Sequence, residues 1–431
     1  MKEKNKKKYS AIKYIICSLL VIGCIAIGIY SHFGGFGTGA CADTEEFAKY
    51  AASVDDITIP EHTQIVALGE ATHGNAEFQQ LRLDVFQVMV EKYDIRAFAL
   101  EGDYGGCEVV NRYIHGGSGT AEEAASAIGF AIYRTEEMAD LFLWMRTYNE
   151  TAEPGQDICF YGFDMQRQEY NYQFLLEAAK NSDVNTDELE KIWDMDKKEY
   201  SEDYSLQQRT EIITSVKNEL IQKDEQQNAH AIHFADILLQ NIELGKHMED
   251  ASLIGVRDEL MAQNVEWILT QEEARGNSRI FISGHNGHVK RYGSYYGTEY
   301  KYMGNLLADK YEDNYFVIGT DFYQAKCNLP KGQNRKRITH TFYSYDPLAK
   351  AAKKCGYDIS YLDFSIIPED SELKSQITEY TYMGSLGESY TPLYLVLPAA
   401  YREWASPSES YDSMIYVTNA HPTIIRDEVT P

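Results

Sequence analysis

Short apolar runs that end in polar residues recur along the chain and predict buried strands. They lie at residues 65–68, 97–100, 158–161, 279–283 and 315–319. Apolar side chains at helical spacing predict helices at residues 75–93, 121–132, 136–148 and 303–311. Strands that alternate with helices are typical of a parallel sheet with helices on both faces. Two later runs, at residues 393–397 and 414–417, predict short strands that complete this sheet.

The alternation of strands and helices stops between about residues 169 and 276. This segment is rich in Glu, Gln, Lys and Leu and shows two long helical patterns, at residues 205–248 and 253–274. It contains no convincing strand pattern. We interpret it as a large helical insertion, a lid or second lobe attached to the α/β core.

The N-terminus has a different pattern. Six lysines lie within residues 1–13, and an uncharged apolar run follows at residues 14–30. The run is at the short end for a membrane-spanning helix and long for the core of a signal peptide. Because a buried core helix would not carry such a basic flank, we interpret residues 14–30 as a signal anchor with its basic end in the cytoplasm. The rest of the chain would then lie outside the cell membrane.

Two other N-terminal arrangements remain open. The residues that end at Cys24 resemble the cleavage signal of a lipoprotein, and a cleavage near residues 40–42 would give a secreted protein. In each case the glycine-rich start of residues 31–55 predicts a tether. Residues 56–431 then form the folded domain.

The charge of the chain limits its partners. The formal net charge is −26, and residues 1–30 contribute six lysines and one glutamate, so the remainder carries −31. A surface this acidic repels phosphate backbones, which argues against nucleic acid as a partner and favours a neutral or cationic substrate.

The cysteines predict neither a zinc ribbon nor a disulfide framework. Two of the seven lie in the apolar N-terminal run, and the other five show no CxxC spacing. Cys159 falls inside a strand pattern, and we interpret it as a small core residue.

Polar residues with catalytic chemistry follow several predicted strands, at the sheet edge where α/β proteins bind ligands. The candidate site residues are Glu70, His73, Arg82, Glu101, His285 and His288. Arg82 belongs to this set because its helical spacing places a guanidinium beside or within a buried apolar stripe. A charge there is costly unless a carboxylate or a ligand pairs with it.

This set of residues is compatible with more than one chemistry. The sequence contains no GxSxG elbow, P-loop or HExxH motif. A histidine held by carboxylates can take a proton from water near neutral pH, and Arg82 or a second histidine could face the oxyanion of an attacked ester. His73, Glu101, His285 and His288 would also make a plausible metal site. The spacing alone does not choose between them.

Several motifs together resemble the erythromycin esterase family. They are GEATHG at residues 69–74, Arg82, LEGD at 100–103, WMRTYN at 144–149, YGFDMQ at 161–166, RDELMAQN at 257–264 and GHNGH at 284–288. The resemblance extends from about residue 56 to the C-terminal IYVTNAHPT. It implies a three-layer α/β/α sandwich with a mainly parallel sheet and a helical lobe over the cleft. It also implies hydrolysis of a carboxylic ester, such as a macrolide lactone, without a covalent intermediate.

The resemblance assigns a role to each candidate residue. His73 would be the general base that activates water, and Glu70 and Glu101 would orient and tune it. The same cleft would be lined by Arg82, His285 and His288. At Tyr133 the family pattern leads us to expect a tryptophan, so the lining of the cleft differs there.

The leading interpretation is therefore a hydrolase of a small-molecule ester or lactone that needs no cofactor. Two alternatives remain open. One is a metal-dependent hydrolase that uses the same histidines and glutamates. The other is a non-enzymatic protein that binds a ligand or haem.

Overall fold

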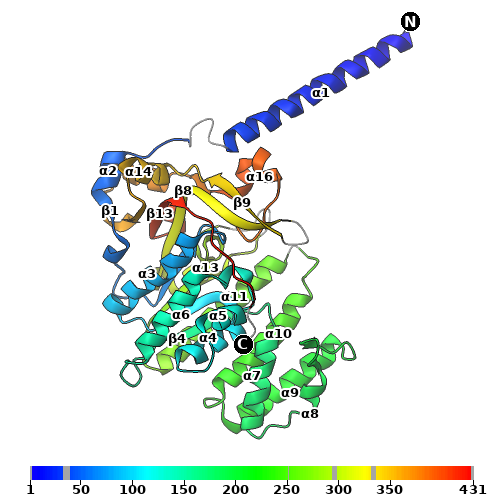
Figure 1. The fold of residues 1–431 in the computed structure, drawn as a ribbon, viewed down its shortest axis with the longest axis vertical. Helices are drawn as coiled ribbons and strands as arrows, with labels where there is room; N and C mark the ends of the chain where they lie inside the picture. The colour runs from blue at the N-terminus through cyan, green and yellow to red at the C-terminus, as the bar shows by residue number, and fades with distance from the viewer. Residues whose placement is uncertain (1, 33–38, 251, 294–298, 332–335, 429–431) are drawn as a thin grey trace. The chain divides into compact units, whose positions relative to one another are not determined.

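The computed structural model describes residues 2–32, 39–250, 252–293, 299–331 and 336–428 (Figure 1). The chain forms two compact units. The first unit comprises residues 1–56, 70–78 and 319–423. The second comprises residues 57–69, 79–318 and 424–431.

Parallel strands form the centre of the second unit. In sheet order they are β8 (Tyr315–Lys331), which begins in this unit, β2 (Ile65–Glu70), β7 (Ile280–His285), β3 (Ala97–Asp103) and β4 (Cys159–Asp164). β2 pairs in parallel with β8, and β3 pairs in parallel with both β7 and β4. All residues of β2, β3, β4 and β7 are buried, as expected for strands that helices cover on both faces.

Helices separate these strands along the chain. They are α3 (Ala76–Tyr93), α4 (Tyr104–Ile114), α5 (Ala121–Ala127), α6 (Glu136–Asn149), α12 (Asn286–Val289) and α13 (Met303–Tyr311). An aromatic cluster holds sheet and helices together. Phe98 stacks on Phe160 with ring centroids 5.3 Å apart, and Phe86 of α3 meets Phe98 edge-on at 5.0 Å.

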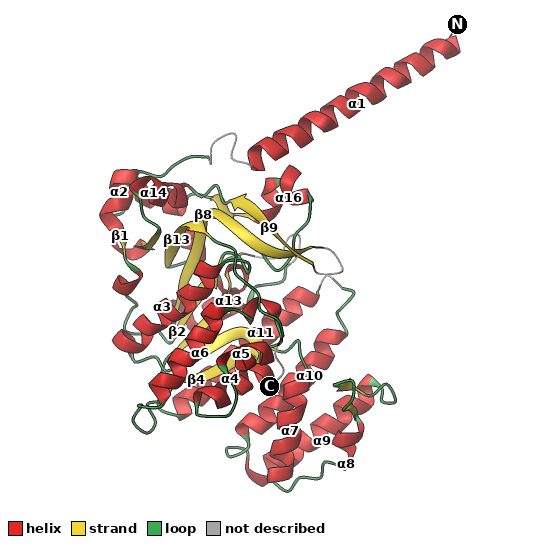
Figure 2. Ribbon diagram, in the orientation of Figure 1, coloured by secondary structure: helices red, strands yellow, loops and turns green. Residues whose placement is uncertain are grey.

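The helical insertion also belongs to the second unit. Its helices are α7 (Glu169–Asn181), α8 (Asp187–Lys191), α9 (Leu206–Asp224), α10 (Ala229–Gly245) and α11 (Leu253–Ala274). Figure 2 shows α7 to α10 as a group of helices beside a minimal hairpin. That hairpin, β5 (Trp193–Asp194) and β6 (Glu199–Tyr200), was not expected, and the predicted helix at residues 205–248 is two helices, α9 and α10.

The first unit contains mostly antiparallel pairs. Its strands are β1 (Ala51–Ala52), β9 (Lys336–Tyr343), β10 (Ile359–Asp363), β11 (Thr381–Gly384), β12 (Arg402–Ala405), β13 (Ser413–Ala420) and the later part of β8. Its helices are α1 (Lys2–His32), α2 (Thr44–Tyr50), α14 (Pro347–Cys355), α15 (Glu372–Thr378), α16 (Leu393–Val396) and α17 (Pro407–Ser410). β10 pairs antiparallel with β1 and β13, and β9 pairs antiparallel with β8.

One predicted strand is wrong. Residues 393–397 contain the short helix α16, between Pro392 and Pro398. A run of four or five apolar residues has no periodicity that separates a strand from a helix, and a proline just before the first turn suits a helix start. The strand predicted at residues 414–417 is present as β13 and belongs to the main sheet.

Helix α1 does not end in solvent. The part from Ile12 to His32 is long and apolar enough to cross a membrane. At its end the His32 ring is buried and meets the rings of Phe342 and Tyr401 edge-on, with centroids 5.7 and 5.8 Å apart. The Tyr345 hydroxyl donates a hydrogen bond to the Ser31 carbonyl (2.8 Å). The residues predicted as a tether, 31–55, thus include the docked end of α1 and the helix α2, while residues 33–38 lie outside the described part.

The predicted fold class is confirmed. The chain is an α/β protein with a mainly parallel central sheet, many helices and an apolar N-terminal helix.

Candidate active site

Glu70 and His73 form a buried pair in the first unit. Glu70 is the last residue of β2, and His73 lies in the loop that follows. His73 Nδ1 lies 2.5 Å from Glu70 Oε1, and only 8% of His73 is exposed. A carboxylate on Nδ1 fixes the ring and leaves Nε2 as the nitrogen that exchanges a proton with a substrate or water.

The loop around His73 is fixed by hydrogen bonds on both sides. The Ala71 N–H donates to Thr320 Oγ1 (2.9 Å), and the His73 N–H donates to the Leu386 carbonyl (3.3 Å). The Thr72 hydroxyl donates to Asn75 Oδ1 (2.5 Å). The histidine therefore sits on a backbone whose position is set by two other segments of the first unit and by a hydrogen bond within the loop.

A second polar cluster, in the second unit, is centred on Glu101 of β3. Its Oε2 accepts a hydrogen bond from the His285 N–H (2.7 Å), and its Oε1 accepts one from Arg257 Nη2 (2.9 Å). His288 Nε2 lies 3.4 Å from the same Oε1. The buried carboxylate is thus held by a backbone donor and a guanidinium, which stabilise its charged form.

Acidic residues hold the two nitrogen-bearing side chains of this cluster, Arg257 and His288. Asp258 Oδ1 lies 2.8 Å from His288 Nδ1, and Asp164 Oδ2 accepts from Arg257 Nη2 at 2.7 Å. Burial disfavours the charged form of His288, but Asp258 and then Glu101 outweigh burial and raise its pKa. His288 Nε2 also lies 3.2 Å from Arg257 Nη1. The ring therefore accepts from the guanidinium when neutral and can donate to Glu101 when protonated.

His285 serves as the N-cap of α12. Its Nδ1 accepts a hydrogen bond from the Gly287 N–H (3.1 Å), so in the neutral ring the proton is on Nε2. The preceding residue, Gly284, allows the Glu101 carboxylate to lie close to the β7 backbone, because a Cβ at Gly284 would lie 3.0 Å from Glu101 Oε2. The centroids of the His285 and His288 rings are 6.3 Å apart.

The candidate residues thus fall into two groups. Glu70 and His73 belong to the first unit, whereas Arg82, Glu101, His285 and His288 belong to the second. Chemically, the first group offers an oriented base, and the second offers a histidine whose charged form Asp258 and Glu101 favour, beside a fixed carboxylate. Both are elements of acyl-transfer chemistry to water.

The family model described as erythromycin esterase matches residues 90–420. The chain belongs to the erythromycin esterase family. The match covers Glu101, His285 and His288, while Glu70, His73 and Arg82 precede it.

The chain is also similar to individual erythromycin esterases. It is 24% identical over 354 residues to erythromycin esterase type II of Escherichia coli. The aligned region covers 72% of this chain and 82% of the relative. A variant of the erythromycin esterase EreC in its open conformation has a TM-score of 0.55 at 16% identity, over 84% of this chain and 91% of that one. A Bacillus cereus protein of known structure has a TM-score of 0.72 at 20% identity, and the match covers 89% of this chain and 100% of that one. The structural likenesses show the fold.

In this family member Arg82 is a buried residue of α3. Only 1% of it is exposed, and Nε donates to Ser283 Oγ at 3.2 Å while Nη1 donates to Gln79 Oε1. Its guanidinium also lies over the Tyr133 ring, 5.4 Å from the centroid. Ser283 comes two residues before His285 on β7, so Arg82 supports the strand that carries one of the candidate histidines.

Tyr133, where a tryptophan was expected for the erythromycin esterase family, contacts the same region. Its hydroxyl donates a hydrogen bond to the Glu101 carbonyl at 2.7 Å, and its ring is fully buried. The residue therefore fixes the backbone of Glu101 and covers Arg82.

The sequence-based site omitted three residues of the Glu101 cluster: Asp164, Arg257 and Asp258. The first ends β4, and the other two lie near the start of α11. Their motifs, YGFDMQ and RDELMAQN, were part of the family resemblance, and this was the available signal. Their side chains were not assigned to the site because Arg257 is 156 residues from Glu101 along the chain.

Proposed function

We propose that this protein hydrolyses a carboxylic ester, with His73 as the general base and water as the nucleophile. The observation that carries the proposal is the buried Glu70–His73 pair, with 2.5 Å between Oε1 and Nδ1. Membership of the erythromycin esterase family and the E. coli relative support a hydrolase. The finer assignment to ester bonds rests on the chemistry of the two polar groups.

In the proposed reaction Glu70 keeps the His73 proton on Nδ1, and Nε2 takes a proton from water as the water oxygen attacks the ester carbonyl. The carbonyl oxygen becomes an oxyanion. When the intermediate collapses, the bond between the acyl carbon and the alkoxide oxygen breaks, and His73 returns the proton to the leaving alcohol. The products are a carboxylic acid and an alcohol, and no bond to the protein forms.

We propose that the Glu101 cluster, in the second unit, is suited to stabilise an oxyanion. Arg257 and His288 supply positive charge, and Asp164, Asp258 and Glu101 fix their positions. Donors that are already oriented stabilise developing charge without reorganising, which is commonly worth several kcal/mol.

The proposed substrate is a neutral or cationic ester or lactone. The net charge of −31 beyond residue 30 disfavours anionic substrates. A macrolide lactone is one candidate, since the name of the E. coli relative indicates an ester of this kind for that protein.

We also propose that α1 anchors the protein in the cell membrane, with the rest of the chain outside. The segment Ile12–His32 has a mean hydropathy of 2.4, and lysines precede it. Ser31 and His32 pack on the first unit, so the residues before them in this segment are the ones available to cross the hydrocarbon core, at about 1.5 Å per residue.

The test is hydrolysis of a panel of lactones and simple esters by the detergent-solubilised full chain and by its His73→Ala variant, with and without a chelator. Turnover that needs His73 and survives the chelator supports the proposal. Turnover that the chelator abolishes and added metal restores would favour the metal-dependent alternative. Failure to cleave any ester, with a ligand retained through purification, would favour the binding protein.

A further inference from the structure

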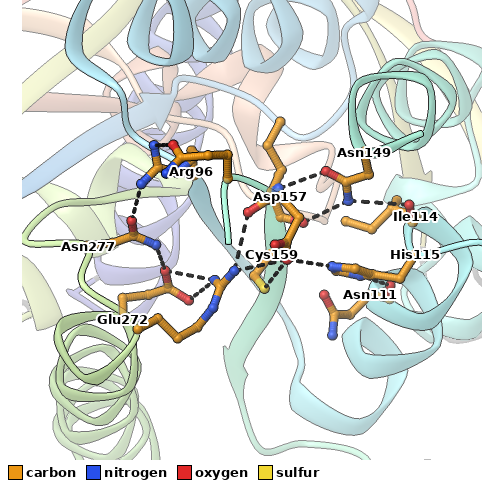
Figure 3. A network of polar contacts seen from close by, with 12 residues as sticks. Arg96, Asn111, Ile114, His115, Asn149, Asp157, Cys159, Glu272 and Asn277 are labelled. Atoms are coloured by element: carbon orange, nitrogen blue, oxygen red, sulfur yellow. Dashed lines mark hydrogen bonds and ion pairs between the residues drawn. The ribbon is translucent and has the colours of Figure 1, made fainter. Parts of the chain in front are cut away.

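Three side chains with metal-binding atoms meet at the amino end of β4, in the second unit. They are His115, which follows α4, Asp157, which precedes β4, and Cys159, the first residue of β4. One ligand atom from each lies within 4.8 Å of the other two. Figure 3 shows His115 and Cys159 on either side of Asp157. This cluster is separate from the Glu101 cluster, which includes Asp164 at the opposite end of the same strand.

The two ring nitrogens of His115 both face acceptors. Nδ1 lies 2.7 Å from the Asn111 carbonyl oxygen, a distance that requires the proton to be on Nδ1. In the neutral ring Nε2 is then an acceptor, yet it lies 3.0 Å from Asp157 Oδ2, which is also an acceptor. Two lone pairs at this distance need a positive charge between them, either a second proton on the ring or a metal ion. A backbone carbonyl on Nδ1 is also the common way to orient a metal-binding histidine.

The distances between the three side chains are close to those around a tetrahedral ion, but the side chains would have to shift to bind one. Zinc bonds of about 2.0–2.3 Å to N, O and S place neighbouring ligands roughly 3.3–3.8 Å apart. The Nε2 to Oδ2 distance of 3.0 Å is shorter than this range and the Sγ to Oδ2 distance of 4.0 Å is longer, so an ion would have to separate His115 from Asp157 and draw Cys159 closer by a few tenths of an ångström. Imidazole, carboxylate and thiolate together favour zinc over the hard ions calcium and magnesium.

A rigid polar network holds Asp157 in place. Arg275 Nη2 donates to Asp157 Oδ2 (2.9 Å), and Arg275 Nη1 donates to both oxygens of Glu272 (2.7 and 3.0 Å). Asn277 and the Tyr161 hydroxyl also donate to Glu272, at 2.6 and 2.5 Å. Because Glu272 compensates the charge of Arg275, the guanidinium orients Asp157 without leaving a net positive charge against an incoming cation.

Cys159 and His115 differ in exposure in a way that suits ion entry. The His115 and Asp157 side chains are about one-third exposed, whereas Cys159 is buried behind them. A thiol binds zinc as the thiolate, so a bound ion would displace the Cys159 proton.

We propose that His115, Asp157 and Cys159 bind a zinc ion, with water as the fourth ligand. The ion would join the end of α4 to the start of β4. Its role would be structural, since the cluster lies at the amino edge of the strands, away from the edge that carries the candidate active-site residues.

The experiment uses the full chain in detergent after removal of metal. Zinc affinity is measured by competition with a chromophoric chelator, and cobalt is used as a spectroscopic probe of sulfur ligation. We expect one zinc site per chain and a thiolate-to-cobalt charge-transfer band. His115→Asn should lower zinc affinity at least tenfold, Cys159→Ser should also remove the band, and His421→Asn, an exposed histidine outside the cluster, should change neither.

His115 is partly exposed, so His115→Asn keeps the test valid if Cys159→Ser does not fold. Equal zinc affinity of the unchanged chain and a folded His115→Asn variant would overturn the proposal. So would a cobalt complex without a sulfur band. The zinc site and the proposed esterase are separable, because His115→Asn should leave ester turnover unchanged.

Discussion

Glu70 Oε1 and His73 Nδ1 lie 2.5 Å apart in the first unit, with both side chains buried. The pair sits at the point where a fully buried strand ends and a hydrogen-bonded loop begins. A glycine precedes it for a physical reason, since a Cβ at Gly69 would collide with Asn286 Oδ1. The geometry at this strand end therefore depends on the glycine as well as on the two polar residues.

His73→Ala should lower ester turnover by roughly two to four orders of magnitude, because positioned proton transfer contributes about that much. The substitution removes a ring from a loop and should leave the folded state intact. Turnover and thermal unfolding are measured together, with His62→Ala, an exposed histidine, as the matched control. Near-normal turnover in folded His73→Ala would exclude His73 as the base.

Arg82→Lys should reduce kcat while leaving KM nearly unchanged, because Arg82 is buried and donates to Ser283 on the strand that carries His285 and to Gln79. A lysine cannot reproduce the two directed contacts of the guanidinium. The matched control is Arg96→Lys, a buried arginine that bonds to Asn277 at the amino end of the strands. If Arg82→Lys changed only the melting temperature, Arg82 would be a purely structural residue.

The sequence predicted the candidate residues best where the chemistry follows directly from a strand. Glu70, His73 and Glu101 could be placed because each ends or follows a buried apolar run, and parallel strands deliver such residues to one sheet edge. The same rule predicted β2, β3 and β7, although each strand is longer than its apolar run because the polar end residues still take part in the sheet.

The residues that the sequence missed depend on long-range packing. Arg257 and Asp258 lie on a helix of the insertion, and the local pattern around them does not indicate which side faces the sheet. Helix α16 was predicted as a strand for a related reason. Four apolar residues are too few to show whether their hydrophobic periodicity is that of a helix or a strand. The sequence gives no indication that His32 is buried, because only tertiary packing places its ring against Phe342 and Tyr401.

Asp258→Asn should shift the alkaline limb of the pH–rate profile to lower pH. Asp258 raises the pKa of His288, so its charge favours protonated His288, and activity that needs this charge is lost as pH rises through that pKa. An asparagine keeps an oxygen beside the ring but removes the charge. The acid limb of the profile should not move.

The profiles are compared with that of Asp236→Asn, which breaks an ion pair with Lys217 in the helical insertion. An unchanged alkaline limb in Asp258→Asn would show that protonated His288 does not contribute to the rate.

Shortening the chain at two positions should show whether the end of α1 belongs to the folded domain. Removal of residues 1–27 keeps Ser31 and His32, whereas removal of residues 1–34 takes away the ring that packs on Phe342 and Tyr401 and the carbonyl that accepts from Tyr345. Losing a buried ring of this size should lower the unfolding free energy by about 1–2 kcal/mol. Urea unfolding of the two shortened chains measures the difference, and His32→Ala in the longer one isolates the ring. Equal stability of all three would mean that α1 ends in a tether without contributing to the fold.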